Sequence, residues 1–186
     1  MQSVKRMDSA ALKDSVKSGI VAGQVAAWAI FGLFLSIDAT LLTPPGTFYR
    51  MIGMALGQGP SADLYTGFAL HMATATAIGV IYMIISNSIK PLYIGSVFKG
   101  LATGTMTGIA VWGVLFLPLH FGVMQPMLQG MAADASSPDR EIAARLVQLS
   151  TTILAGSLAL HILFGGVLGF AGRLATSSGE LLEKEH

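Results

Sequence analysis

Cysteine is absent from the 186-residue chain, and charged residues are scarce. Without cysteine there is no disulfide framework, no iron–sulfur cluster and no thiolate zinc site, so any metal or cofactor must use histidine, methionine or oxygen ligands. Charged residues make up 11% of the chain, against about 25% in soluble domains. This composition excludes an ordinary water-soluble globule. The balance of 11 basic and 10 acidic residues, a net charge of +1, also argues against a nucleic-acid partner.

The few charges leave four long apolar windows, between residues 17 and 38, 63 and 90, 99 and 134, and 145 and 173. An α-helix needs about 20 apolar residues to cross the hydrocarbon layer of a bilayer, and each window supplies them. We therefore predict an all-α polytopic membrane protein with four transmembrane helices in a single membrane domain, residues 1–186. The helix cores are expected at residues 19–37, 65–86, 100–122 and 149–172. We expect the first helix to be retained rather than removed as a signal peptide.

The distribution of Lys and Arg predicts the orientation of these helices. Eight of the eleven basic residues fall in the N-terminal arm, the second connection and the tail. Basic residues concentrate on the cytoplasmic side of membrane proteins. Both termini are therefore expected in the cytoplasm, in a cell (inner) membrane protein.

The two connections on the expected outer side are long and partly apolar. After the sequence Thr-Pro-Pro at 43–45, apolar residues continue to Gly57, which predicts a short interfacial helix. In the other connection, we expect Pro118 to bend or end the third transmembrane helix. Residues 137–139 are expected to start the fourth helix before it enters the bilayer.

The first two predicted transmembrane helices share a pattern with the last two. At an offset of 81 residues, Gly19, Gly23 and Gly32 correspond to Gly100, Gly104 and Gly113. At an offset of 90 residues, Ala69, Leu70, His71 and Gly79 correspond to Ala159, Leu160, His161 and Gly169. We predict two parallel two-helix repeats, about residues 18–88 and 99–176, related by a pseudo-twofold axis along the membrane normal.

Small residues in these repeats predict how the helices pack. Small residues spaced four apart lie on one helix face, where two backbones can approach closely. We interpret eight glycines as helix-packing residues: Gly19, Gly23, Gly79, Gly100, Gly104, Gly108, Gly165 and Gly169. Gln24, the only side-chain amide of the first helix, is expected to bridge helices.

Two histidines occupy corresponding positions in the predicted spans, His71 in the second and His161 in the fourth. An ionisable side chain inside an apolar span is costly and is a functional candidate by default. Both lie about 15 residues from the inner ends of their helices, so we expect them at one depth in the outer half of the bilayer. His120 is expected to reach the outer boundary nearby, so three imidazoles could gather there.

Three interpretations of these histidines stay open. In the first, each neutral imidazole bonds to a carbonyl or hydroxyl of a neighbouring helix; the hydroxyls considered are those of Thr74, Thr105, Thr107 and Thr152. In the second, His71 and His161 are the axial ligands of a b-type haem. In the third, copper is bound, because thioether and imidazole ligands suit Cu(I). The methionines on the expected outer side are Met51, Met54, Met124, Met127 and Met131.

Several short motifs follow one another in a distinctive order. They are Thr43, Pro44 and Pro45; His71, Gly79 and Tyr82; Lys90; Gly100 and Gly104; Phe116, Leu117, Pro118 and Leu119; and His161. This order resembles the YagU-like small inner-membrane proteins, and the resemblance covers most of the chain. It implies a four-helix fold in the inner membrane and supplies no substrate.

The chain has no P-loop, dinucleotide fingerprint, H-E-x-x-H or G-x-S-x-G motif, and no carboxylate pair lies in a predicted span. We therefore expect a non-catalytic multi-pass protein without a cofactor. Its expected partners are the lipid bilayer and either other membrane subunits or its own copies, so it would be an accessory subunit of a larger complex or a homo-oligomer. The alternative is a haem b or copper protein that uses His71 and His161, and the third possibility is a small transporter or channel.

Overall fold

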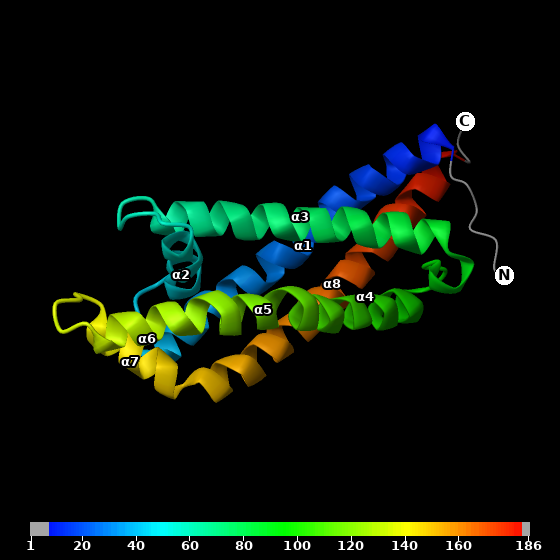
Figure 1. Ribbon diagram of the computed structural model, residues 1–186. Coiled ribbons are helices and arrows are strands. Elements are labelled where there is room, and N and C mark those ends of the chain that lie inside the picture. Colours follow the sequence, from blue (N-terminus) through cyan, green and yellow to red (C-terminus); the bar gives the residue numbers. More distant parts are fainter. Residues whose placement is uncertain (1–7, 184–186) are drawn as a thin grey trace. The chain divides into compact units, whose positions relative to one another are not determined.

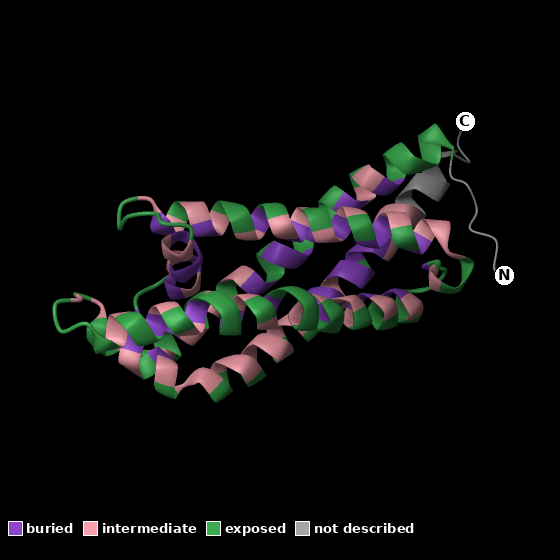
Figure 2. Cartoon of the chain, viewed as in Figure 1, coloured by how far each residue is buried: buried purple, intermediate pink, exposed green. Residues whose placement is uncertain are grey.

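The computed structural model describes the backbone of residues 8–183 and the side-chain surroundings of residues 8–176. All regular structure in this part of the chain is helical (Figure 1). Four helices are long and apolar enough to span a membrane, which confirms the all-α fold and the four apolar segments. They cover Ser9–Leu41, Asp63–Ser88, Val97–Ala133 and Ser150–Thr176. Buried and exposed residues alternate along them (Figure 2), as in helices that face protein on one side.

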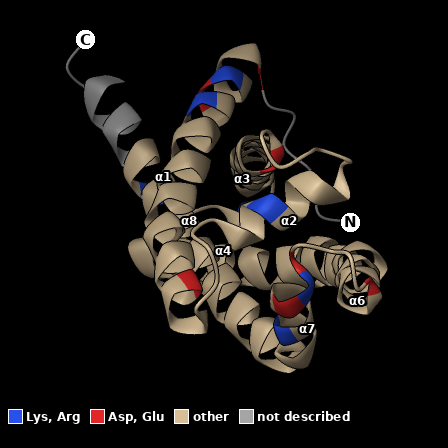
Figure 3. Cartoon of the chain, turned by 90° about the vertical axis from the view of Figure 1, so that its left-hand side faces the viewer, with Lys and Arg blue, Asp and Glu red and all other residues tan. Residues whose placement is uncertain are grey.

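The elements follow the order expected from the apolar windows. They are α1 (Ser9–Leu41), α2 (Thr47–Ala55), α3 (Asp63–Ser88), η1 (Lys90–Leu92), α4 (Val97–Val111), η2 (Trp112–Phe116), α5 (Leu117–Leu119), η3 (His120–Met124), α6 (Gln125–Ala133), α7 (Arg140–Gln148) and α8 (Ser150–Glu183). Charged residues mark several helix starts. The carboxylate of Asp8 accepts the N–H of Ala11 at 2.8 Å at the start of α1, and Asp63 opens α3. Figure 3 shows the long helices uncharged over most of their length.

The third apolar helix does not end at Pro118, although an end was one of the two outcomes expected there. The helix from α4 to α6 continues through Pro118 because a π-helical turn stands on each side of it, η2 before and η3 after (Figure 1). The N–H of Leu117 bonds to the carbonyl of Trp112, and that of Gln125 to the carbonyl of His120, five residues back in each case. The wider turns shift the hydrogen-bond register around a residue that has no N–H.

Each of the two long connections contains a short helix. The first, α2, was expected, whereas the second, α7, was expected to be the start of the fourth long helix. The short helix after the Thr-Pro-Pro sequence is α2. In the other connection, residues 137–139 precede a separate helix, α7, which stops at its C-cap Leu149 before α8 begins. The fourth long helix therefore begins at Ser150 rather than at residues 137–139.

By its internal contacts, the chain separates into two compact units. Unit 1 comprises Met1–Phe31, Met72–Gly108 and Ile162–His186, and unit 2 comprises Gly32–His71 and Ile109–His161. Each unit takes segments from all four long helices. The two units pack their segments by different means.

In unit 1, α1 and α3 approach backbone to backbone. A methyl group on Gly19 would lie 2.7 Å from the carbonyl oxygen of Gly79, and one on Gly23 would overlap the carbonyl oxygen of Ala75. Real Cβ atoms do not come so close to a carbonyl oxygen, so these positions admit only glycine without a backbone shift. Gln24 adds a hydrogen bond across the same pair, donating to the Thr76 hydroxyl at 2.5 Å. Gln24 therefore bridges helices, as expected.

The other helix pair of unit 1, α4 and α8, makes the same kind of contact. A methyl group on Gly100 would lie 2.6 Å from the carbonyl oxygen of Gly169, and one on Gly104 would overlap the carbonyl oxygen of Gly165. Gly108 is buried, and its N atom would lie 2.9 Å from a methyl group on Gly165.

Hydrogen bonds between side chains join further segments of unit 1. The hydroxyls of Tyr82 on α3 and Thr103 on α4 lie 2.8 Å apart. Asn87 on α3 donates to the hydroxyl of Ser15 on α1 at 2.9 Å. These polar groups hold the helix pairs in register.

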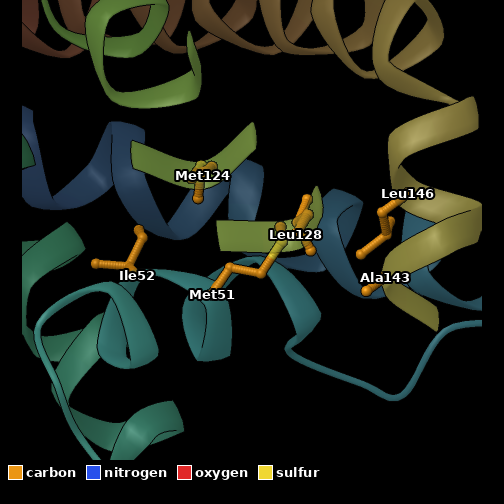
Figure 4. Packing of buried hydrophobic residues seen from close by; sticks show 6 residues of the cluster. All are labelled: Met51, Ile52, Met124, Leu128, Ala143 and Leu146. Atoms are coloured by element: carbon orange, nitrogen blue, oxygen red, sulfur yellow. The ribbon is translucent and has the colours of Figure 1, made fainter. Parts of the chain in front are cut away.

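Unit 2 packs through large side chains instead. Its buried cluster consists of Met51, Ile52, Met124, Leu128, Ala143 and Leu146. The cluster draws on α2, η3, α6 and α7, and Figure 4 shows Ala143 and Leu146 on α7 facing Leu128. The short connecting helices are therefore part of the packed interior of this unit.

Candidate functional site

His71 lies on α3 among aromatic rings of unit 2. Its ring centroid is 5.4 Å from that of Tyr49, 5.7 Å from that of Phe34 and 5.9 Å from that of Phe48, all in edge-on arrangements. Its Nε2 atom is buried and has no hydrogen-bond partner among the described residues. A buried nitrogen without a partner loses its hydration and gains nothing in return.

His161 lies on α8 and has one ring nitrogen fixed. Its Nδ1 is 2.7 Å from the carbonyl oxygen of Ser157, one turn earlier on the same helix. Because a carbonyl only accepts, Nδ1 carries the proton and donates it. In the neutral ring, the lone pair then belongs to Nε2. The ring centroid lies 5.5 Å from that of Phe116.

Both histidines belong to unit 2. That they face one common region of the protein stays a prediction. Their partners differ from those expected: His161 bonds to its own helix instead of a neighbour, and the four threonine hydroxyls considered form no hydrogen bond with either histidine among those observed.

His120 belongs to a structural hydrogen-bond network. Its Nε2 lies 3.1 Å from the hydroxyl of Ser150, which also accepts the amide of Gln125 at 2.5 Å. Its ring stacks on Phe116 at 5.6 Å, so Phe116 contacts both His120 and His161. Among the side chains described, those of residues 8–176, no group of three or more histidine or acidic residues is placed to hold a metal ion.

The five candidate methionines are found in and around the apolar cluster of unit 2. Met51 and Met124 are buried members of it (Figure 4), while Met54, Met127 and Met131 pack against it. Phe48 packs against the same cluster, and thus contacts both His71 and the cluster that contains the methionines.

Sequence reasoning missed the polar residues that anchor α2. The buried carboxylate of Asp38 accepts the N–H of Gly46 at 2.7 Å and the hydroxyl of Thr43 at 3.1 Å. Arg50 on α2 pairs with buried Asp63 at 3.5 Å. Asp38 and Asp63 were visible only as the borders of apolar windows, and their spacing gives no sign of these partners.

Two further glycines and one tyrosine complete the anchor of α2. A methyl group on Gly53 would overlap the backbone of Asp63, and one on Gly67 would overlap the carbonyl of Tyr49, so α2 and α3 touch through their backbones.

Burial, and to a lesser extent the negative charge of Asp38, raise the pKa of Tyr49 well above its ordinary value. Its phenol therefore stays protonated.

Comparisons with protein-family models, curated proteins and solved structures give no match. The resemblance to YagU-like proteins stays an expectation from short motifs.

Proposed function

We propose that the chain is a non-catalytic multi-pass protein of the cell membrane. The observation that carries the proposal is the set of four long apolar helices together with the large apolar side chains exposed along them. Met106, Val114 and Trp28, for example, are 70%, 71% and 54% exposed. In water such surfaces would drive aggregation, whereas in a bilayer they face hydrocarbon.

The proposed orientation places both termini in the cytoplasm. The support is the bias of Lys and Arg toward the N-terminal arm, the second connection and the tail. Because the chain has no cysteine, single cysteines can be labelled without background. With a membrane-impermeant thiol reagent on intact cells, we expect Ser136→Cys to react and Ser178→Cys to stay protected. The opposite pattern would reverse the orientation.

We also propose that the helices form two equivalent repeats. The glycine contacts support it, because the offsets of 81 and 90 residues convert the Gly19–Gly79 contact into Gly100–Gly169 and the Gly23–Ala75 contact into Gly104–Gly165. Four contacts related by the offsets found in the sequence favour one duplicated two-helix unit.

The proposed role of the protein is structural, as an accessory subunit of a larger membrane complex or as a homo-oligomer. The support is the use of its internal polar groups: Gln24, Tyr82 and Asn87 in unit 1, and Trp112 and His120 in unit 2, each hydrogen-bond to another helix. Such bonds fix helix positions.

The test is native mass spectrometry on membranes of the source cells, extracted directly into lipid nanodiscs. We expect the chain in a species of defined stoichiometry, with its own copies or with other membrane subunits. A lone monomer throughout would contradict the role.

A second candidate function, metal binding, is favoured by the unpartnered Nε2 of His71.

A further inference from the structure

We propose that the connection between α3 and α4, residues 90–99 of unit 1, is a binding surface for the headgroups of anionic phospholipids. The proposal rests on the proposed membrane insertion and goes beyond it, because insertion alone requires no preference among lipids. Three observations carry it: basic residues gather at one end of unit 1, its lysines have no partner in the described part of the chain, and exposed apolar side chains accompany the two lysines of the connection.

The two units differ in their balance of charge. Among the side chains described, unit 1 has more basic than acidic residues, and unit 2 has more acidic than basic ones. The charged residues of unit 1 are Lys13, Lys17, Lys90, Lys99 and Arg173, with Asp8 and Asp14. Those of unit 2 are Arg50, Arg140 and Arg145, with Asp38, Asp63, Asp134, Asp139 and Glu141. Basic segments beside a bilayer attract anionic lipids, so charge complementarity directs such lipids to unit 1.

A hydrogen bond fixes the lysines of α1 beside the start of the connection. Asn87, near the end of α3, donates to the hydroxyl of Ser15 on α1 at 2.9 Å. Ser15 is buried and lies midway between Lys13 and Lys17, which are both exposed. Lys90 begins η1 just after α3 ends and is exposed as well. The three lysines therefore lie at one end of unit 1, where α1 begins and α3 ends (Figure 1).

Ile94 holds the other half of the connection against α4 and α8. It is buried, and its side chain would lie 3.0 Å from a methyl group on Gly100 and 3.6 Å from one on Gly172. Lys99 directly precedes the first of these glycines, and Arg173 directly follows the second. Packing contacts thus place these two basic residues around the same connection.

The four lysines of unit 1 have no charge partner in the described part of the chain. Their ammonium groups form no ion pair and no hydrogen bond within residues 8–176. Basic residues of unit 2 behave differently, because Arg50 pairs with Asp63 at 3.5 Å and Arg140 donates to the carbonyl of Ala132 at 3.2 Å. Phosphate groups are good partners for lysine. The charge of these lysines is therefore available to the phosphates of lipid headgroups.

The apolar side chains between Lys90 and Lys99 favour a lipid over a soluble anion. Phe98 is 80% exposed, and Val97 and Tyr93 are exposed as well. Aromatic residues concentrate at the headgroup level of a bilayer, where a ring can contact acyl chains while a lysine reaches the phosphates. A soluble phosphate gains nothing from such side chains. The combination fits the boundary between headgroups and acyl chains.

The experiment measures which lipid surrounds the connection, in the whole chain reconstituted in nanodiscs of phosphatidylcholine and phosphatidylglycerol. A fluorophore attached to Gly95→Cys is the reporter, and the chain has no other cysteine. A side chain fits there, since a methyl group on Gly95 would meet only the ring of Tyr93, at 3.9 Å. Nitroxide groups on the acyl chains of one lipid or the other quench the fluorophore at short range. We expect a local enrichment of phosphatidylglycerol of about fivefold or more.

Substitution of the two lysines of the connection should remove this enrichment. We expect equal quenching by both lipids when Lys90→Gln and Lys99→Gln are combined. Replacing both lysines with arginine keeps the charges and should keep the enrichment. The matched control is Arg145→Gln, an exposed basic residue of unit 2, which should leave it unchanged. Salt at about 1 M should abolish it, because the Debye length is then about 3 Å.

The outcomes distinguish this proposal from the proposed membrane insertion. Quenching by neither lipid would contradict insertion, and this proposal with it. Equal quenching by both lipids without the lysine substitutions, or an enrichment that survives the double glutamine variant, would overturn the headgroup proposal and leave insertion intact. Excess inorganic phosphate at constant ionic strength should not change the enrichment. Its loss would assign the lysines to a soluble phosphate and would also overturn the proposal.

Discussion

The two units of this protein pack their helices in opposite ways. Unit 1 brings backbones into contact through glycine, with Gly23 against Ala75 and Gly104 against Gly165. Unit 2 fills its interior with methionine, leucine and aromatic rings and uses the short helices α2 and α7 to do so. In the proposed bilayer setting, lipid offers little hydrophobic drive for helix association, so both solutions depend on close van der Waals contact. The first depends on the absence of side chains and the second on their shape, so the two units should respond differently to substitution.

The largest expected effect is in unit 1. Gly104→Leu or Gly165→Leu should lower the free energy of unfolding in detergent by about 3 kcal/mol or more, because the added side chain must push two backbones apart. The control is Gly59→Leu, since a methyl group on Gly59 would meet no atom within 4 Å. Gly156→Ala, a helical glycine with equally open surroundings, should stabilise by about 0.5 kcal/mol. Equal losses for all four variants would contradict packing through glycine.

In unit 2 the damaging change is removal of a side chain. Met124→Ala should cost about 2 to 3 kcal/mol, because Met124 is 2% exposed and truncation leaves a cavity among the cluster residues. Met106→Ala is the control within the same long helix, at 70% exposure. If the two substitutions had the same effect on thermal unfolding, the cluster would not be the core of this unit.

A smaller effect is expected from the hydrogen bond between α3 and α4. Tyr82→Phe removes the hydroxyl that lies 2.8 Å from that of Thr103 and should cost about 1 kcal/mol. Thr103→Val removes the other partner. In the double variant, the total loss should be smaller than the sum of the single losses. Additive losses would show that the two hydroxyls do not interact.

The smallest effect concerns pH and Tyr49. Because its pKa is raised in the folded protein, the stability it contributes is complete below the pKa of an unfolded tyrosine, about 10, and falls as the pH rises through the folded pKa. Between about pH 8 and about pH 10.5 the wild type should lose about 0.8 kcal/mol more than Tyr49→Phe. Exposed Tyr65→Phe is the control and should follow the wild type. Identical pH profiles for all three proteins would contradict burial of the phenol.

The features of unit 1 that the sequence predicted are local or periodic. Apolar windows, glycines spaced four apart and Gln24 each carry their meaning within one helix, and the fold places them accordingly. The offsets of 81 and 90 residues also predicted which glycines of α4 and α8 correspond to the small residues of α1 and α3.

Unit 2 was less predictable because its important partners are distant in sequence or depend on backbone groups. A bend or an end of the helix was expected at Pro118, and nothing in the sequence indicated the π turns on both sides that carry the helix past this proline. The carbonyl that holds His161 belongs to the backbone of Ser157, which no residue pattern marks. Asp38 reaches Gly46 across a turn, and a single sequence does not show such a pairing.

The central claim is that unit 1 consists of two equivalent helix pairs, and distances between spin labels test it most directly. The cysteine-free chain allows one labelled pair at Ile20 and Ala73 on α1 and α3, and the corresponding pair at Leu101 and Leu163 on α4 and α8. All four side chains are exposed, so the labels leave the glycine contacts undisturbed. In lipid nanodiscs, pulsed electron spin resonance should give coincident distance distributions for the two pairs. Clearly separate distributions would contradict the equivalence of the two helix pairs.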